Sequence, residues 1–74
     1  MRVQLNNTLL AEHLLRSNVS LNDFARTATL SGGYLSQLLA GKRTPSGRVR
    51  ERLIIATGMS FDDLFLIIRD RSDV

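Results

Sequence analysis

The sequence lacks several residue types on which small proteins often depend. It has no cysteine among its 74 residues, and this excludes disulfide bonds and thiolate metal sites. Its longest apolar run, Leu64 to Ile68, is far shorter than the roughly 20 residues that a membrane-spanning helix needs. No signal-peptide pattern is present. We therefore expect a soluble intracellular protein with no membrane partner.

Groups suited to catalysis or metal binding are also scarce. The single histidine, His13, is expected at a helix surface. Asp62 and Asp63 are adjacent, so they point in different directions on a helix, where they favour its N-terminus electrostatically. Asp70 and Asp73 have no neighbours that would complete a metal site. Because no nucleophile, base and orienting group occur together, we predict that the protein is not an enzyme and needs no metal or cofactor.

A chain of this length predicts one small domain, residues 1–74. Such a chain buries only roughly 60% of the surface that its unfolded form exposes. Without disulfides, its stability has to come from dense helix packing, from well-capped helices or from a second copy of the chain.

Positive charge is concentrated in one segment. The net charge is only +3, but five of the ten lysines and arginines lie between positions 42 and 52: Lys42, Arg43, Arg48, Arg50 and Arg52. The segment contains one acid, Glu51. This clustering favours a polyanionic partner, while the alternative is a solvated helix face. At helical spacing Arg48 and Arg52 share a face, which could form a phosphate-binding patch. Arg50 points in another direction, toward a residue near Glu51 or toward a partner subunit.

Capping residues predict where five helices begin. Asn7 precedes "TLLAEHLLRS", and four serines precede the other apolar-periodic segments: Ser20, Ser31, Ser46 and Ser60. The third helix is expected over 32–40 and the fourth over 47–57, each followed by a glycine suited to a left-handed helix end. The pattern predicts an all-α fold, a compact five-helix bundle.

The two ends of the chain fit this pattern less well. "MRVQLN" alternates apolar and polar residues, and "LFLIIRDR" contains β-branched residues. The second segment is compatible with a helix tail or with a strand, because short apolar runs are ambiguous. If both ends are strands, they could pair as a short antiparallel ribbon.

The middle of the chain resembles a known family. Residues 20–46, "SLNDFARTATLSGGYLSQLLAGKRTPS", resemble the helix-turn-helix core of λ-repressor-like (Cro/repressor, XRE-type) DNA-binding domains, and "SGRVRERLIIATGMSFDDLF" resembles their last two helices. The features occur in a fixed order: Phe24-Ala25 before the turn, Leu30-Ser31 at the start of the next helix, and then "GKRTPS". The helix-turn-helix core would span about residues 20–40.

This resemblance implies a sequence-specific regulator of transcription, of the phage or bacterial repressor type, that binds double-stranded DNA in the bacterial cytoplasm or nucleoid. Helix 31–40 would lie in the major groove. A homodimer is expected at least on DNA, with the last helix and the apolar terminal segments as its contact surface. The alternative is a protein-interaction module on the same fold, which binds a toxin or a component of the transcription machinery.

Specific residues match the positions through which the family contacts DNA. Those that resemble base-reading positions are Gly32, Gly33, Tyr34 and Gln37. Those expected at phosphates are Ser20, Ser31, Ser36, Lys42 and Arg43, together with Arg48. Gln37 is able to pair with adenine through two hydrogen bonds, and Tyr34 is able to contact a phosphate or a thymine methyl.

Two departures from the family pattern lead to structural expectations. Gly32 and Gly33 stand where polar readers are usual, either because the backbone approaches DNA closely or because a side chain would clash with a neighbouring helix. Thr29 stands at the turn position usually held by glycine, so it has to adopt a strained conformation or alter the turn.

Overall fold

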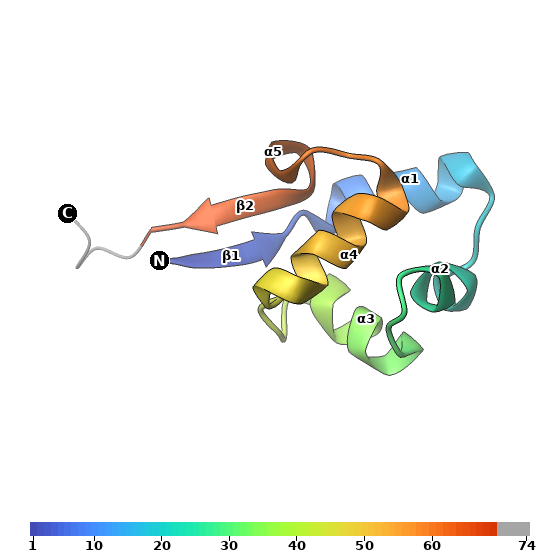
Figure 1. The fold of residues 1–74 in the computed structure, drawn as a ribbon, viewed down its shortest axis with the longest axis horizontal. Helices are drawn as coiled ribbons and strands as arrows, with labels where there is room; N and C mark the ends of the chain where they lie inside the picture. Colours follow the sequence, from blue (N-terminus) through green and yellow to red (C-terminus); the bar gives the residue numbers. More distant parts are fainter. Residues whose placement is uncertain (70–74) are drawn as a thin grey trace.

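Five helices and two terminal strands make up the part of the chain that the computed structural model describes, residues 1–69 (Figure 1). In chain order, the elements are β1 (Arg2–Leu5), α1 (Asn7–Ser17), α2 (Leu21–Thr27), α3 (Gly32–Leu39), α4 (Gly47–Thr57), α5 (Phe61–Leu64) and β2 (Phe65–Ile68). The five predicted helices are confirmed, and the open question about the two ends is decided in favour of strands. The fold is thus a small helical bundle that carries a two-stranded sheet.

The predicted serine caps are confirmed. The hydroxyl oxygens of Ser20, Ser31, Ser46 and Ser60 each accept a hydrogen bond from the backbone N–H three residues later, at 3.1 to 3.3 Å. The first helix is different, because its N-cap is Asn6, whose Oδ1 accepts from Leu9 N at 3.2 Å. The prediction that Asn7 precedes the helix was therefore wrong by one residue. Asn7 lies in the first turn, where its Nδ2 donates to Leu39 O at 2.9 Å and joins α1 to the end of α3.

A left-handed glycine follows α3 and α4. Gly41 and Gly58 have φ angles of +74° and +73°, as the sequence predicts for both positions. After α3, Lys42 N donates to Gln37 O at 2.9 Å and Gly41 N donates to Leu38 O at 3.1 Å, which satisfies the last helical carbonyls. The strained alternative for Thr29 is also confirmed, because its φ is 61°.

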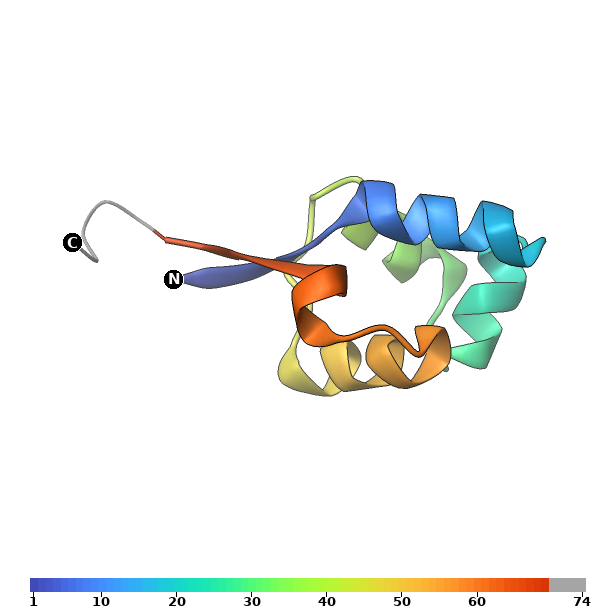
Figure 2. The same ribbon diagram turned by 90° about the horizontal axis from the view of Figure 1, so that it is seen from above.

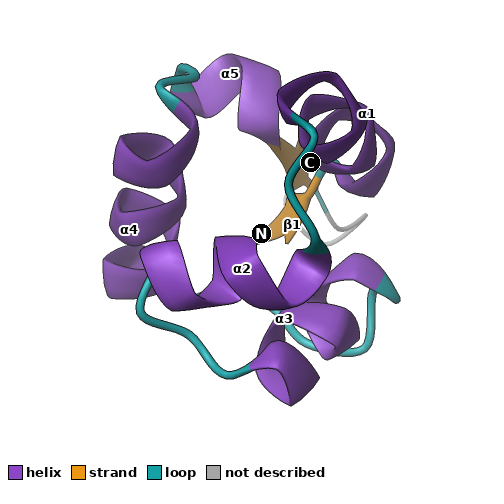
Figure 3. Cartoon of the chain, turned by 90° about the vertical axis from the view of Figure 1, so that its right-hand side faces the viewer, coloured by secondary structure: helices purple, strands orange, loops and turns teal. Residues whose placement is uncertain are grey.

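The core lies at the centre of the ring that the helices form in the end-on view (Figure 3). Its buried members come from all five helices and both strands: Leu5, Leu10, Leu14, Phe24, Ala25, Ala28, Leu35, Leu38, Leu53, Leu64 and Phe65. His13 is half-buried, with its ring edge-on to Phe24 at a centroid distance of 6.5 Å. The expectation of a surface histidine was thus wrong in part, because His13 is three residues after Leu10 and lies at the edge of the buried face of α1.

The two strands form a ribbon that extends away from the helices (Figures 1 and 2). They pair antiparallel, with Leu5 opposite Phe65 and Val3 opposite Ile67. Leu5 and Phe65 are buried and join this terminal ribbon to the core, whereas Leu66 and Ile67 are each 49% exposed. The outer part of the terminal ribbon therefore presents apolar side chains to solvent.

Candidate nucleic-acid interface

Helix α3 has one face in the core and one face at the surface. Leu35 and Leu38 are completely buried, and they hold the helix against α2 and the rest of the bundle. Leu30 N donates to Ala25 O at 2.7 Å, which closes the turn between α2 and α3. Gly33, Ser36 and Gln37 lie on the exposed side of α3. The sequence thus folds locally so that a short, rigidly placed helix shows a polar face.

An open hollow of about 460 Å³ lies between the exposed face of α3, at Tyr34 and Gln37, and the loop that follows the helix. The residues that line this α3 hollow are Tyr34, Gln37, Lys42, Arg43 and Thr44. Two of these are cations and none is an acid. Four residues that the sequence marks as DNA contacts are therefore brought together, and Thr44 joins them.

Arg43 lies against two of the other side chains of the α3 hollow. Arg43 Nε donates to Gln37 Oε1 at 2.7 Å, and the Arg43 guanidinium carbon lies 5.9 Å from the centre of the Tyr34 ring. Sequence reasoning missed this cluster, because the chain reverses direction after Gly41 and helical spacing no longer relates Arg43 to Gln37. The glycine at the helix end is the only signal in the sequence for such a reversal.

The two glycines of α3 have different surroundings. A Cβ added at Gly32 would lie 2.7 Å from Oδ1 of Asn22 on α2, whereas a Cβ added at Gly33 would meet no atom within 4 Å. The packing explanation thus applies to Gly32, although the atom it would meet is the end of a movable side chain. Gly33 has no such packing reason, and its backbone is open to an approaching molecule.

The serines expected at phosphates are all exposed. The oxygens of Ser20 and Ser31 accept the N-cap hydrogen bonds from Asp23 and Tyr34. A hydroxyl that accepts a bond keeps its own proton for donation, so both serines still offer a donor to an anion. Ser36 lies on the exposed face of α3, one residue before Gln37.

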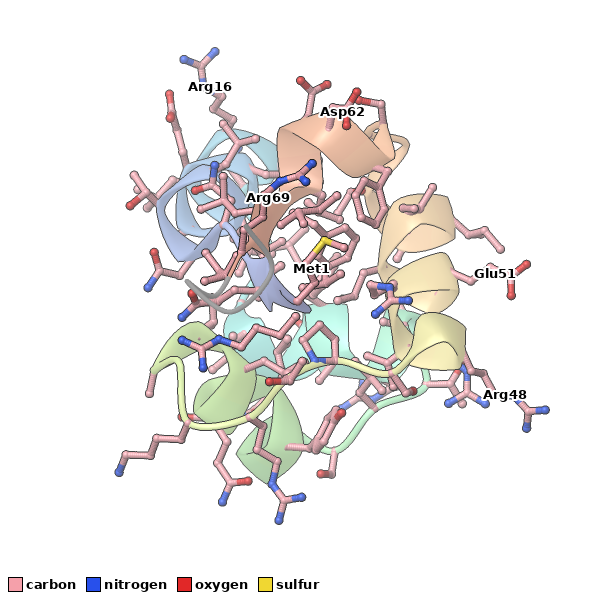
Figure 4. All side chains as sticks on the ribbon, turned by 90° about the vertical axis from the view of Figure 1, so that its left-hand side faces the viewer. Met1, Arg16, Arg48, Glu51, Asp62 and Arg69 are labelled. Atoms are coloured by element: carbon pink, nitrogen blue, oxygen red, sulfur yellow. The ribbon has the colours of Figure 1, made fainter. Side chains whose placement is uncertain are left out.

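The three arginines of α4 have different surroundings. Arg48 points into solvent at the start of α4 (Figure 4) and does not line the α3 hollow. Arg52 Nη1 donates to Thr29 O at 3.4 Å, at the turn between α2 and α3. Arg50 Nη1 donates to Pro45 O at 3.0 Å, so it supports the loop before α4 instead of pairing near Glu51. Arg48 and Arg52 are both exposed and lie one helical turn apart on α4, so the phosphate-binding patch expected of them stays a prediction.

Acidic side chains lie away from the α3 hollow. Asp62 on α5 and Arg16 on α1 are on the side of the molecule opposite α3 (Figure 4). Glu12 pairs with Arg16 at 2.8 Å, and Asp23 pairs with Arg26 at 3.7 Å. Asp70 and Asp73 lie outside the described residues. Within residues 1–69, no three acids, histidines or cysteines gather as metal ligands.

None of the helices in the described part of the chain combines the length and the apolar character needed to cross a bilayer.

Comparisons of this chain with protein families, with curated proteins and with solved structures found no match.

Proposed function

We propose that this protein is a sequence-specific regulator of transcription that binds double-stranded DNA through α3. The observation that carries the proposal is the α3 hollow, where polar side chains of an exposed helix face stand beside Lys42 and Arg43 with no acid among them. The order of motifs in residues 20–46 supports the same function and a λ-repressor-like fold.

In this proposal α3 enters the major groove, which is about 12 Å wide and accommodates an α-helix. Tyr34 and Gln37 lie on the surface that would face the base edges. Lys42 follows the helix end, and with Ser36 it would contact the phosphates at the edge of the groove. The open backbone at Gly33 lets the first turn of α3 approach DNA without a side chain in between.

The proposal includes a homodimer that forms through the terminal ribbon. Two strands alone are marginally stable in water, and this ribbon joins the two ends of the chain without a connecting turn. If the edge of β2 that does not pair with β1 paired antiparallel with β2 of a second copy, the half-exposed Leu66 and Ile67 would lie beside their counterparts on the two faces of one larger sheet. A two-fold axis between the copies would relate their two α3 helices, so that each could bind one half-site of a palindromic DNA sequence.

Sedimentation of two matched variants tests the dimer. Ile67→Lys puts a charge on the exposed part of β2, so we expect it to be monomeric at concentrations where the wild type is dimeric. Ile55→Lys is the control, because Ile55 on α4 is 77% exposed and lies outside the terminal ribbon. A wild-type monomer on and off DNA, or a dimer that persists in Ile67→Lys, would overturn this arrangement.

The DNA-binding proposal is tested by selecting bound duplexes from a random pool at near-physiological salt, with Gln37→Ala in parallel. We expect one motif to be enriched and the substitution to relax it at one position. An inverted repeat in the motif would also support the dimer. If no motif is enriched above background, the proposal is wrong.

A second candidate function is a protein-interaction module on the same fold. It is favoured by Ile55, an exposed apolar side chain at a hollow of about 370 Å³ that Thr27, Thr29 and Arg52 also line. Salt separates the two functions, because DNA affinity falls with a log–log slope of about −0.9 for each phosphate contact. A protein-interaction module would bind bulk DNA weakly and show no such slope.

A further inference from the structure

We propose that Arg43 reads a guanine base and that Gln37 is the residue that positions it. This inference rests on the proposed DNA-binding function and goes beyond it, because it replaces two separate contacts, Arg43 on phosphate and Gln37 on adenine, with one composite reader.

The hydrogen bond between the two side chains determines which way the Gln37 amide faces. Arg43 Nε donates to Gln37 Oε1 at 2.7 Å, and an arginine only donates hydrogen bonds. The amide oxygen must therefore face Arg43, and the Gln37 NH₂ group is turned away from it. Pairing with adenine requires the oxygen to accept from N6 while the NH₂ donates to N7. In this arrangement Arg43 occupies one of the two lone pairs of the oxygen and holds it on the Arg43 side, so the NH₂ group is the part of the amide that Gln37 presents.

Because this bond uses Nε, the two terminal nitrogens of the Arg43 guanidinium can still donate hydrogen bonds to DNA. No protein group within residues 1–69 accepts a hydrogen bond from the two terminal nitrogens of Arg43. The Gln37 oxygen holds Nε, and the Tyr34 ring lies 5.9 Å from the guanidinium carbon. Two contacts thus restrict the orientation of a planar fork, which is the group that binds guanine O6 and N7 with two parallel hydrogen bonds.

An arginine that only neutralises phosphate does not need its guanidinium held in one orientation. Arg43 and Gln37 are both exposed, and holding an exposed arginine in one geometry costs side-chain entropy. The neighbouring Lys42 is also exposed, but it carries a compact ammonium on a flexible stem in place of a planar fork. A mobile ammonium suits a phosphate as a point charge, whereas an oriented fork suits a base.

The composite reader predicts a feature of the bound DNA. Arg43 would select a guanine, and the Gln37 NH₂ group, which only donates, would exclude cytosine at a neighbouring position, because cytosine has no major-groove acceptor. Recognition of adenine by Gln37 through two hydrogen bonds would instead select adenine alone at that position, so the breadth of the base preference in the selected motif distinguishes the two modes of recognition.

Substituting Arg43 by lysine separates base reading from phosphate binding. Arg43→Lys keeps the charge and removes both the Nε donor and the fork. We expect the salt slope on random duplex to stay the same, while the preference for guanine at one position falls roughly ten- to a hundred-fold. Lys42→Ala is the matched control, and it should weaken binding to every duplex by the same factor and lower the salt slope.

Two substitutions at Gln37 test its positioning role. Gln37→Leu removes the acceptor for Arg43 Nε, so the guanine preference that depends on Arg43 should weaken. Gln37→Glu restores an acceptor, so the same guanine preference should return, although the added negative charge lowers affinity for all duplexes alike. Loss of the guanine preference in Gln37→Glu as in Gln37→Leu would contradict the positioning role.

The outcomes distinguish the inference from the function on which it rests. If the wild type selects a motif and Arg43→Lys leaves every position of it unchanged, Arg43 is a phosphate contact and the composite reader is wrong, while the DNA-binding function stands. If the wild type selects no motif, the proposed function fails and the inference fails with it. Circular dichroism of each variant confirms that the helices are intact.

Discussion

The α3 hollow and the terminal ribbon are two exposed regions of opposite character on the same small bundle. The α3 hollow presents two cations and uncharged donors, whereas the terminal ribbon presents Leu66 and Ile67, each 49% exposed. Both regions are joined to the core by buried residues next to them in the chain, Leu38 in α3 and Phe65 in β2. The difference shows that one core supports two surfaces suited to different partners. The α3 hollow is suited to an anion, and the terminal ribbon is suited to another apolar surface.

The contrast also separates the two kinds of partner we propose. Positive charge in the loop beside an exposed helix face is matched by a polyanion such as DNA, and an open strand edge with apolar side chains is matched by another strand. A second copy of the chain would satisfy the terminal ribbon and leave both α3 hollows free. Substitutions that affect one region and spare the other test whether the two surfaces are independent.

The largest effect is expected at the root of the terminal ribbon. Phe65→Ala removes a side chain that is only 3% exposed and should lower the free energy of unfolding by about 3–5 kcal/mol. The neighbouring Leu66→Ala should cost less than about 1 kcal/mol at concentrations where the protein is monomeric. Urea unfolding measures both. Equal losses for the two variants would show that the terminal ribbon is not divided into a buried root and an exposed outer part.

A smaller effect is expected from single cations. Lys42→Ala should lower the log–log salt slope of DNA binding by about 0.9, the value for one phosphate contact. Arg16→Ala is the control, because Arg16 lies on the opposite side of the molecule from α3 (Figure 4) and is already paired with Glu12. Titrations at several salt concentrations give the slopes. If Arg16→Ala changed the slope as much as Lys42→Ala, the binding surface would not be localised at α3.

Gly33→Ala should move stability and DNA binding in opposite directions. The added methyl group meets no atom within 4 Å in the protein, and alanine favours a helix over glycine by about 0.5–1 kcal/mol. The variant should therefore be more stable by about that amount, as thermal unfolding would show, and should bind DNA more weakly. Unchanged DNA affinity would mean that the backbone of the first turn does not approach DNA.

The smallest effect is expected at the turn. Thr29→Gly relieves the left-handed strain of a β-branched residue whose φ is 61°, but it also increases the entropy of the unfolded chain. The two terms oppose each other, so we expect a gain of only a few tenths of a kcal/mol and no change in the DNA motif. A marked loss of stability would show that the Thr29 side chain has a stabilising contact of its own.

Local features of the fold could be predicted from the sequence because they depend on neighbouring residues. Ser20 and Ser31 cap helices through bonds to the N–H three residues on, and Gly41 ends α3 through its own backbone freedom. The same reasoning was wrong by one residue at Asn7, since Asn6 and Asn7 are both good caps. Four of the five side chains that line the α3 hollow could be named from the sequence, but their mutual contacts could not.

The sequence by itself thus determined the caps, the helix ends, the apolar positions and the cluster of cations, all of which act within a few residues of the chain. Only the tertiary structure decided that the two termini pair as strands, since nothing in "LFLII" alone distinguishes a strand from a helix tail. The tertiary structure also decided that Arg43 bonds to Gln37 and that Gly32, but not Gly33, lies against Asn22. These contacts depend on how the chain turns and how separate elements pack, and local preferences do not contain that information.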